Sequence, residues 1–149
     1  MTKMKGANTT MRLWHKDLIP YLPRQQLIGQ WRECCCIAKS INISGTPNHI
    51  LVNKIMDYPV SHFNRYAWEV YKEMKSRGYN CRWLSFEKWC INTCYDWELT
   101  EVFNDWHNDR YLTQCLYNLQ EKYDCGGISE EEWDKICSIK ESLNNLTNN

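Results

Sequence analysis

The segment Met11-Arg-Leu-Trp-His-Lys-Asp-Leu-Ile-Pro-Tyr-Leu-Pro-Arg-Gln-Gln-Leu-Ile-Gly-Gln-Trp-Arg-Glu-Cys34 leads into the helix that decides the predicted fold. Pro23 suits the first position of a helix, because the N–H group that proline lacks has no helical acceptor there. No further proline occurs before Pro47, and apolar residues recur at helical spacing, so we expect a helix over residues 23–40. Its apolar stripe consists of Leu27, Trp31, Cys34, Cys35 and Ala38.

A second, polar face of this helix carries Gln26, Gln30 and Glu33, which follow one another at i, i+4 and i+7. Glu33 and Asp17 are the two acidic residues among the first 40. Gly29 lies one turn before Glu33, where glycine weakens a helix by about 1 kcal/mol relative to alanine but leaves space beside the carboxylate. The face is either an uncluttered platform for chemistry by one acid or an ordinary solvated surface.

Four further helices are indicated by apolar periodicity and by capping signals. Ser61 and Ser85 are candidate N-caps, and Gly78 is a stop signal. Ser129-Glu-Glu-Glu132 has the form of a capping box. The helices are expected over residues 61–77, 86–97, 109–122 and 129–143.

Little of the chain has the pattern of a strand, so the predicted fold is all-α, a compact single domain without internal repeats. We expect this domain to span residues 11–143. Residues 1–10 have the composition of a flexible N-terminal extension, and the Asn-rich residues 144–149 that of a disordered tail. Residues 42–59 carry turn signals and are expected to form an irregular link.

The chain contains no apolar run approaching the roughly 20 residues that span a membrane. Its first ten residues are polar and basic, unlike a secretory signal. These features predict a cytoplasmic protein without a membrane partner.

The net charge is zero, but the charge is unevenly distributed along the chain. Residues 1–90 contain 14 basic and 6 acidic side chains, a net charge of +8, and residues 91–149 contain 4 and 12, a net charge of −8. Such asymmetry favours a basic face for a polyanion such as nucleic acid, although the charges can also balance in three dimensions. The cations around the Arg32-Glu33 pair are Arg12, Lys16, Arg24, Arg32 and Lys39.

Nine cysteines, an odd number, and the Cys34-Cys35-Cys36 run argue against a disulfide framework. Cys90, Cys94 and His107 leave a zinc-dependent module as an alternative, although paired C-x-x-C knuckles are absent and buried free thiols explain the cysteines better. Most of the eight tryptophans lie on apolar stripes and are expected in the core. Trp14 and Trp31, near Glu33, remain candidates for stacking on bases.

Three motifs, Met11-Arg-Leu-Trp-His15, Leu22-Pro-Arg-Gln-Gln-Leu27 and Arg32-Glu33, together resemble the pyrimidine-dimer DNA glycosylase family, the phage-type endonuclease V. The resemblance is good over residues 11–80 and continues weakly through His107-Asn-Asp-Arg-Tyr-Leu-Thr-Gln-Cys-Leu-Tyr-Asn-Leu119.

The resemblance implies a compact all-α monomer without metal or organic cofactor that acts on cyclobutane pyrimidine dimers in damaged double-stranded DNA. An N-terminal α-amine would attack the sugar C1′ and form a Schiff base, and β-elimination at the abasic site would then nick the strand. Glu33 corresponds to the family's essential carboxylate. The residues expected to bind DNA are Arg32, Gln26, Gln30, Lys16 and Arg24.

The sequence does not identify the reactive amine. Arg12 aligns with the family's N-terminus, but ten residues precede the Met11-Arg12 stretch here. A chain from Met1 would present Thr2 after removal of Met1, and a chain from Met11 would keep Met11, because Arg12 blocks trimming. A lysine, Lys16 or Lys5, is a further option.

Two departures from the family bear on function. Gln26 stands where the family has a second pocket histidine, and the family's aromatic, basic C-terminus is replaced by an acidic, Asn-rich one. A non-catalytic DNA- or RNA-binding protein on the same scaffold, which has lost the amine, is therefore the alternative function.

Overall fold

The computed structural model describes residues 11–90, 96 and 98–147, without the side chains of residues 140 and 142–147. Over these residues the chain forms helices and no strand, which confirms the all-α prediction. No helix of the described part is long and apolar enough to cross a membrane. The predicted extension, residues 1–10, lies outside the described residues.

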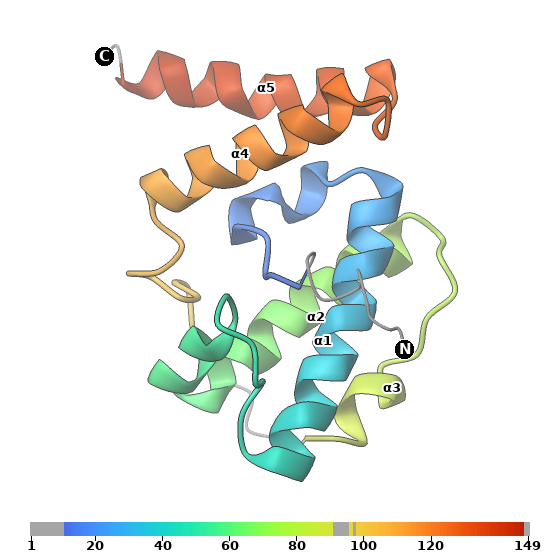
Figure 1. Ribbon diagram of the computed structural model, residues 1–149, viewed down its shortest axis with the longest axis vertical. Coiled ribbons are helices and arrows are strands. Elements are labelled where there is room, and N and C mark those ends of the chain that lie inside the picture. The colour runs from blue at the N-terminus through green and yellow to red at the C-terminus, as the bar shows by residue number, and fades with distance from the viewer. Residues whose placement is uncertain (1–10, 91–95, 97, 148–149) are drawn as a thin grey trace.

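The helices form two parts (Figure 1). α1 (Arg24–Ser44) packs against α2 (Val60–Ser76) and the short α3 (Leu84–Glu87), and α4 (Asp109–Asp124) lies beside α5 (Glu130–Thr147) at the other end of the molecule. The 3-10 helix η2 (Lys16–Tyr21) contacts both α2 and α5 and so joins the two parts. A second 3-10 helix, η3 (Asn53–Asp57), packs on α2 within the link that was expected to be irregular.

Four of the five predicted helices are confirmed, with shifted ends. α1 continues four residues beyond the predicted end and stops where Gly45 adopts a φ of 79°. The predicted capping box is present, because Ser129 Oγ accepts from Glu132 N–H and Glu132 Oε1 accepts from Ser129 N–H, both at 3.1 Å. α5 then runs to Thr147, so the backbone of residues 144–147 is helical rather than a disordered tail.

The predicted helix over 86–97 is wrong where the structure describes it. α3 ends at Glu87, and residues 88–90 form a turn. The Asn42 side chain at the end of α1 donates to the Trp89 carbonyl at 2.9 Å, which takes an acceptor that a continuing helix would use. The prediction that Ser61 caps α2 is also wrong, because Ser61 lies inside the helix and Pro59 precedes it without a side-chain cap.

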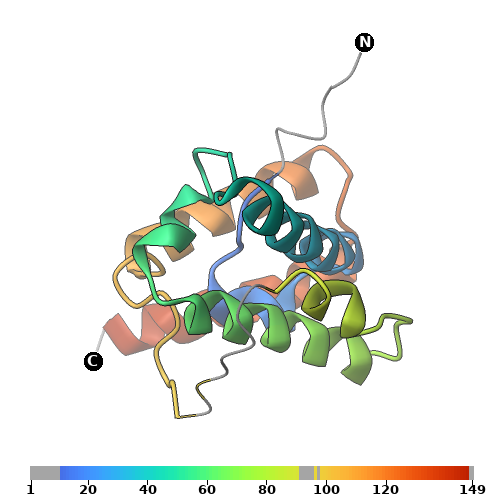
Figure 2. The same cartoon turned by 90° about the horizontal axis from the view of Figure 1, so that it is seen from below.

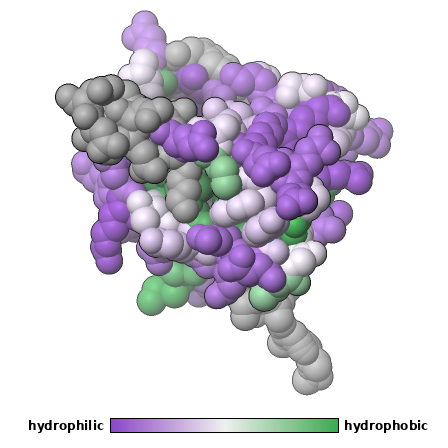
Figure 3. Space-filling model, turned by 90° about the horizontal axis from the view of Figure 1, so that it is seen from above, coloured by the Kyte–Doolittle hydropathy of each residue, from purple (hydrophilic) through white to green (hydrophobic). Residues whose placement is uncertain are grey.

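The apolar stripe of α1 is buried as predicted, apart from the half-buried Cys35. Trp14 and Trp31 are each 6% exposed, so neither is available to stack on a base in this conformation. At the α4–α5 end, the described surface is largely hydrophilic (Figure 3). The exposed acids of these two helices are Asp109, Glu121, Asp124, Glu130, Glu131, Asp134 and Glu141.

Candidate active site

The candidate site begins with the segment of residues 11–14, which lies along α1 and is held there by one buried amide. Gln30 is 1% exposed. Its Oε1 accepts from Trp14 N–H at 2.8 Å, and its Nε2 donates to the Arg12 carbonyl at 2.9 Å. The side chain therefore binds the segment through both a donor and an acceptor, much as a neighbouring strand would.

Two tyrosines complete this attachment. Tyr66 on α2 donates to the Trp14 carbonyl at 2.6 Å, and its hydroxyl lies 3.0 Å from Gln30 Oε1. Tyr111 on α4 donates to the Leu13 carbonyl at 2.6 Å. The carbonyls of residues 12, 13 and 14 all have hydrogen-bond partners, so the backbone of the segment is fixed against α1. We call Gln30, Tyr66 and Tyr111 the clamp.

The clamp aims the backbone nitrogen of residue 12 at Glu33. Arg12 N–H donates to Glu33 Oε2 at 3.2 Å. Burial raises the pKa of Glu33 to about 7, although the N–H and the guanidinium of Arg12 both act to lower it. A carboxyl group with a pKa near neutrality can donate or accept a proton under physiological conditions, as general acid–base catalysis requires.

Space is open beside this carboxylate. A Cβ built on Gly29, one turn before Glu33, would meet nothing within 4 Å. Arg32, the neighbour of Glu33, is exposed and forms no ion pair with the described residues. Gln26, two turns before Glu33, has a buried Oε1 without a hydrogen-bond partner in the described part of the chain. Glu33 thus has an opening one turn before it and an exposed cation at the preceding position.

Some predicted site residues lie elsewhere or have other roles. Gln30, which was expected to bind DNA, is buried, and its amide bonds to the backbone of residues 12 and 14. Lys16 Nζ is ion-paired with Glu101 at 3.1 Å. Arg24 is exposed, and its guanidinium lies 5.4 Å from the centre of the Tyr79 ring. Thr2 lies outside the described residues.

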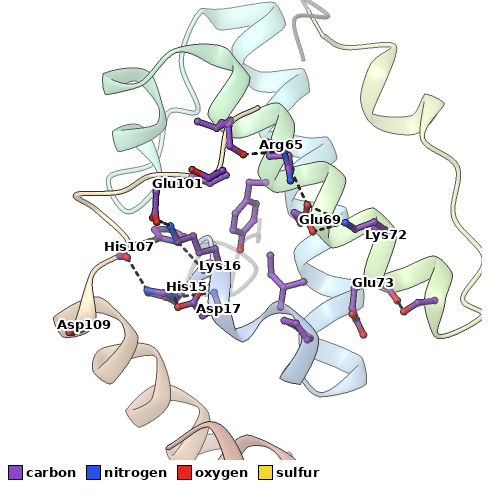
Figure 4. A pocket seen from close by; sticks show the side chains of 17 residues that line it. His15, Lys16, Asp17, Arg65, Glu69, Lys72, Glu73, Glu101, His107 and Asp109 are labelled. Atoms are coloured by element: carbon purple, nitrogen blue, oxygen red, sulfur yellow. Dashed lines mark hydrogen bonds and ion pairs between the residues drawn. The ribbon is translucent and has the colours of Figure 1, made fainter. Parts of the chain in front are cut away.

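A cavity of about 560 Å³ is a different site (Figure 4). Neither Glu33 nor Arg12 lines it. Its three lysine and arginine side chains are all paired with carboxylates: Lys16 with Glu101, and both Arg65 and Lys72 with Glu69. Tyr66 lines this cavity and also belongs to the clamp, so the cavity and the Glu33 site share one wall.

His107 also lines the cavity and is 4% exposed. Its Nδ1 accepts from Lys16 N–H at 2.9 Å, and burial lowers its pKa to about 2, so the ring is neutral. Among the described residues, no three metal-ligating side chains come together. Cys94, which the zinc alternative requires, lies outside that part of the chain.

Sequence reasoning missed Tyr66 and Tyr111, because both lie on apolar stripes and were assigned to the core alone. A buried tyrosine hydroxyl normally has a hydrogen-bond partner. That rule indicates a polar partner for each tyrosine, but it does not identify the segment of residues 11–14.

Comparison with known proteins gives one match. A family model described as pyrimidine dimer DNA glycosylase matches residues 11–84. No curated protein and no solved structure matches. The matched residues include Arg12, Gln30, Glu33 and Tyr66, whereas Tyr111 and the whole of α4 and α5 lie outside the match.

Proposed function

Because the chain belongs to the pyrimidine dimer DNA glycosylase family, we propose that it removes a pyrimidine of a cyclobutane dimer in duplex DNA and then nicks the strand at the abasic site. The supporting observation is the 3.2 Å contact between the nitrogen of residue 12 and the Glu33 carboxylate. It joins the position aligned with the family's reactive terminus to the acid that corresponds to the essential one.

We assign the reactive amine to residue 12. In the full-length chain this nitrogen is an amide and is not nucleophilic, so the proposal requires a chain that begins at Arg12. Because Arg12 blocks the removal of an initiating Met11, such a chain must come from proteolytic cleavage before Arg12. An α-amine has a pKa near 7.7–8.0, and a neighbouring carboxylate can accept its proton. A charged amine beside Glu33 would in turn favour the carboxylate and lower its pKa below the value of about 7 in the full-length chain.

The steps follow from these two groups. The amine attacks C1′ and the glycosidic C1′–N bond breaks, with its electrons moving to the base, which takes a proton from water and stays joined to its dimer partner by the cyclobutane ring. Glu33 accepts a proton from the attached nitrogen and passes it to O4′, so that the C1′–O4′ bond breaks and the sugar ring opens as the Schiff base forms. Glu33 stabilises the developing positive charge and then accepts a proton from C2′, so that the 3′ C–O bond breaks by β-elimination. No metal and no organic cofactor takes part in this scheme.

Arg32 is the proposed contact for the DNA backbone beside the lesion, since its guanidinium is exposed next to Glu33. Arg24 is a second candidate, near the start of the same helix. Gln26 keeps a proposed role, because it is partly exposed and lies two turns before Glu33 on the same face of α1. Lys16 is less suitable while it is paired with Glu101.

Borohydride trapping tests the proposal. Untagged protein that begins at Arg12 would be mixed with an abasic-site duplex or a thymine-dimer duplex, reduced, and analysed on a denaturing gel. Adducts on both duplexes are expected. An adduct on the abasic duplex alone would leave a lyase with another base specificity.

A non-catalytic DNA- or RNA-binding protein is the alternative. The amide at residue 12 in the full-length chain favours it, because this nitrogen cannot form a Schiff base. Protein that binds the duplex but yields no adduct, whether full-length or beginning at Arg12, would support this alternative over the enzyme.

A further inference from the structure

Exposed apolar side chains gather after α1. Of the seven large hydrophobic residues that are exposed in the described part of the chain, five lie between residues 43 and 60. Ile50 is the most exposed of all, at 86%, and its neighbour Leu51 is 46% exposed. We call Ile50 and Leu51 the apolar tip. An aliphatic pair held in water in this way often marks a binding surface.

The tip is supported by a hydrogen-bonded loop. Asn53 Oδ1 accepts from His49 N–H at 3.0 Å, and the His49 carbonyl accepts from Val52 N–H at 3.0 Å. Leu51 N–H donates to His49 Nδ1 at 3.2 Å. Asn48 adopts a φ of 58°, in the left-handed region that asparagine tolerates. These bonds hold the backbone on both sides of Ile50, so the loop keeps the side chains of the tip exposed to solvent.

The loop is attached to the Glu33 face of α1. Ser40 follows Glu33 by seven residues, which is two helical turns and about 10.5 Å along the same face. Ser40 Oγ lies 2.9 Å from the Thr46 carbonyl and 3.3 Å from the Pro47 carbonyl. Figure 2 shows the loop projecting beside the end of α1.

Three exposed cations belong to the stretch of chain from Glu33's neighbour Arg32 to the residues that follow the tip. Arg32, Lys39 and Lys54 are exposed, and the acids of the same stretch, apart from Glu33, are limited to the exposed Asp57. An apolar projection within a basic surface complements duplex DNA, whose phosphates are anionic and whose stacked bases are apolar.

We propose that the apolar tip inserts between base pairs of the bound duplex, within a few base pairs of the lesion, and opens the stack there. This inference rests on the proposed function, because it takes duplex DNA as the ligand of the Glu33 face. The separated step lowers the cost of exposing the sugar carbon and its base.

The test compares Ile50→Ser with Ile50→Leu and with Leu84→Ser, a matched control at a residue that is 64% exposed on α3. Binding would be measured with a duplex carrying a tetrahydrofuran abasic analogue, which cannot react, and 2-aminopurine would report unstacking. Ile50→Ser should weaken binding about tenfold, the loss expected for one buried aliphatic side chain, and should reduce the 2-aminopurine signal. Ile50→Leu and Leu84→Ser should resemble the wild type.

Salt dependence separates the tip from the cations. Ile50→Ser should leave the slope of log K against log salt unchanged, whereas Lys54→Ala should reduce it by about one. A wild-type affinity for Ile50→Ser, or no binding of the duplex by the wild type, would overturn the proposal. A wild-type dimer that Ile50→Ser dissociates would overturn it in favour of an interface between copies.

Schiff-base formation is tested separately from insertion of the apolar tip. Trapping by Ile50→Ser at saturating DNA should approach that of the wild type. If the wild type forms no covalent adduct but Ile50→Ser still weakens DNA binding, the proposed chemistry is wrong and the proposed insertion of the apolar tip is still supported.

Discussion

The two sides of the segment of residues 11–16 differ in how well their charges are compensated. On one side, the 560 Å³ cavity pairs its lysine and arginine side chains with carboxylates, and its His107 is neutral. On the other side, the Glu33 carboxyl has one 3.2 Å hydrogen bond from Arg12 N–H and a pKa of about 7. Compensated charges stabilise a fold, whereas a half-buried acid with a raised pKa costs stability and marks a site for chemistry.

The largest expected difference between the sides comes from Glu33→Gln. In the chain that begins at Arg12, loss of the carboxylate that contacts the nitrogen of residue 12 should reduce Schiff-base trapping and strand cleavage at least about 100-fold, while DNA binding and folding persist. Glu101→Gln, on the cavity side, is the matched control and should retain activity within about threefold, because it removes an exposed ion pair. Equal losses in both variants, measured by single-turnover cleavage, would remove the distinction.

The second-largest effect should be on the pH dependence of folding stability, to which the Glu33 carboxyl contributes through its raised pKa. The pKa of Glu33 is raised on folding, so the folded state holds its proton more tightly, and this group destabilises the fold increasingly as the pH rises from about 4.5 to about 7. Glu33→Gln should therefore be more stable than the wild type at pH 8 by about 1–2 kcal/mol, allowing for partial exposure of the carboxyl.

At pH 4 the gain should vanish, because Glu33 is then protonated in both states. Urea unfolding at the two pH values measures this difference. A stability gain that is equal at pH 4 and pH 8 would show that ionisation of Glu33 is not its cause.

Weakening the clamp should slow Schiff-base formation beside Glu33 by more than the loss of folding stability alone explains. Tyr66→Phe and Tyr111→Phe each remove one buried hydrogen bond to the segment and should cost about 1 kcal/mol of stability. Each should also slow trapping severalfold at saturating DNA, with little change in DNA affinity, because the nitrogen of residue 12 is held less firmly. A proportional loss of folded protein and activity, with no change in rate per folded molecule, would limit these tyrosines to a structural role.

Gly29→Ala gives the smallest and most selective effect. The new methyl meets nothing within 4 Å, so the variant should gain about 1 kcal/mol in helix stability. The same methyl narrows the space beside Glu33 and should reduce cleavage of the dimer duplex severalfold. Thermal unfolding together with cleavage rates measures both effects, and a variant that is more stable and fully active would show that the opening is not used by DNA.

Apolar periodicity predicted α1, α2, α4 and α5, because each buries one stripe whose spacing is local information. Glu33 and Gly29 were recognised from the polar face of a single helix for the same reason. After the end of α3, the Trp89 carbonyl accepts from the Asn42 side chain, 47 residues away in sequence. The spacing of residues along one helix does not predict that contact.

The clamp was hidden for the same physical reason. The polar spacing of α1 predicts a surface position for Gln30. Its backbone partners in residues 12 and 14 belong to a segment without periodicity, so the spacing does not reveal them. The Tyr111 bond to Leu13 spans 98 residues. Helical spacing indicates which side chains share a face, but it does not indicate which distant segment covers that face.

The most direct test of the account compares trapping by two chains, one beginning at Met1 and one beginning at Arg12 after cleavage of a fusion. With an abasic duplex and borohydride, the chain beginning at Arg12 should form the adduct faster, and peptide mapping should locate the DNA on the α-nitrogen of Arg12. The Glu33→Gln version of that chain should form little adduct. An adduct on Lys16 or another lysine, or equal trapping in the Glu33→Gln version, would contradict the assignment of residue 12 and Glu33 as the reacting pair.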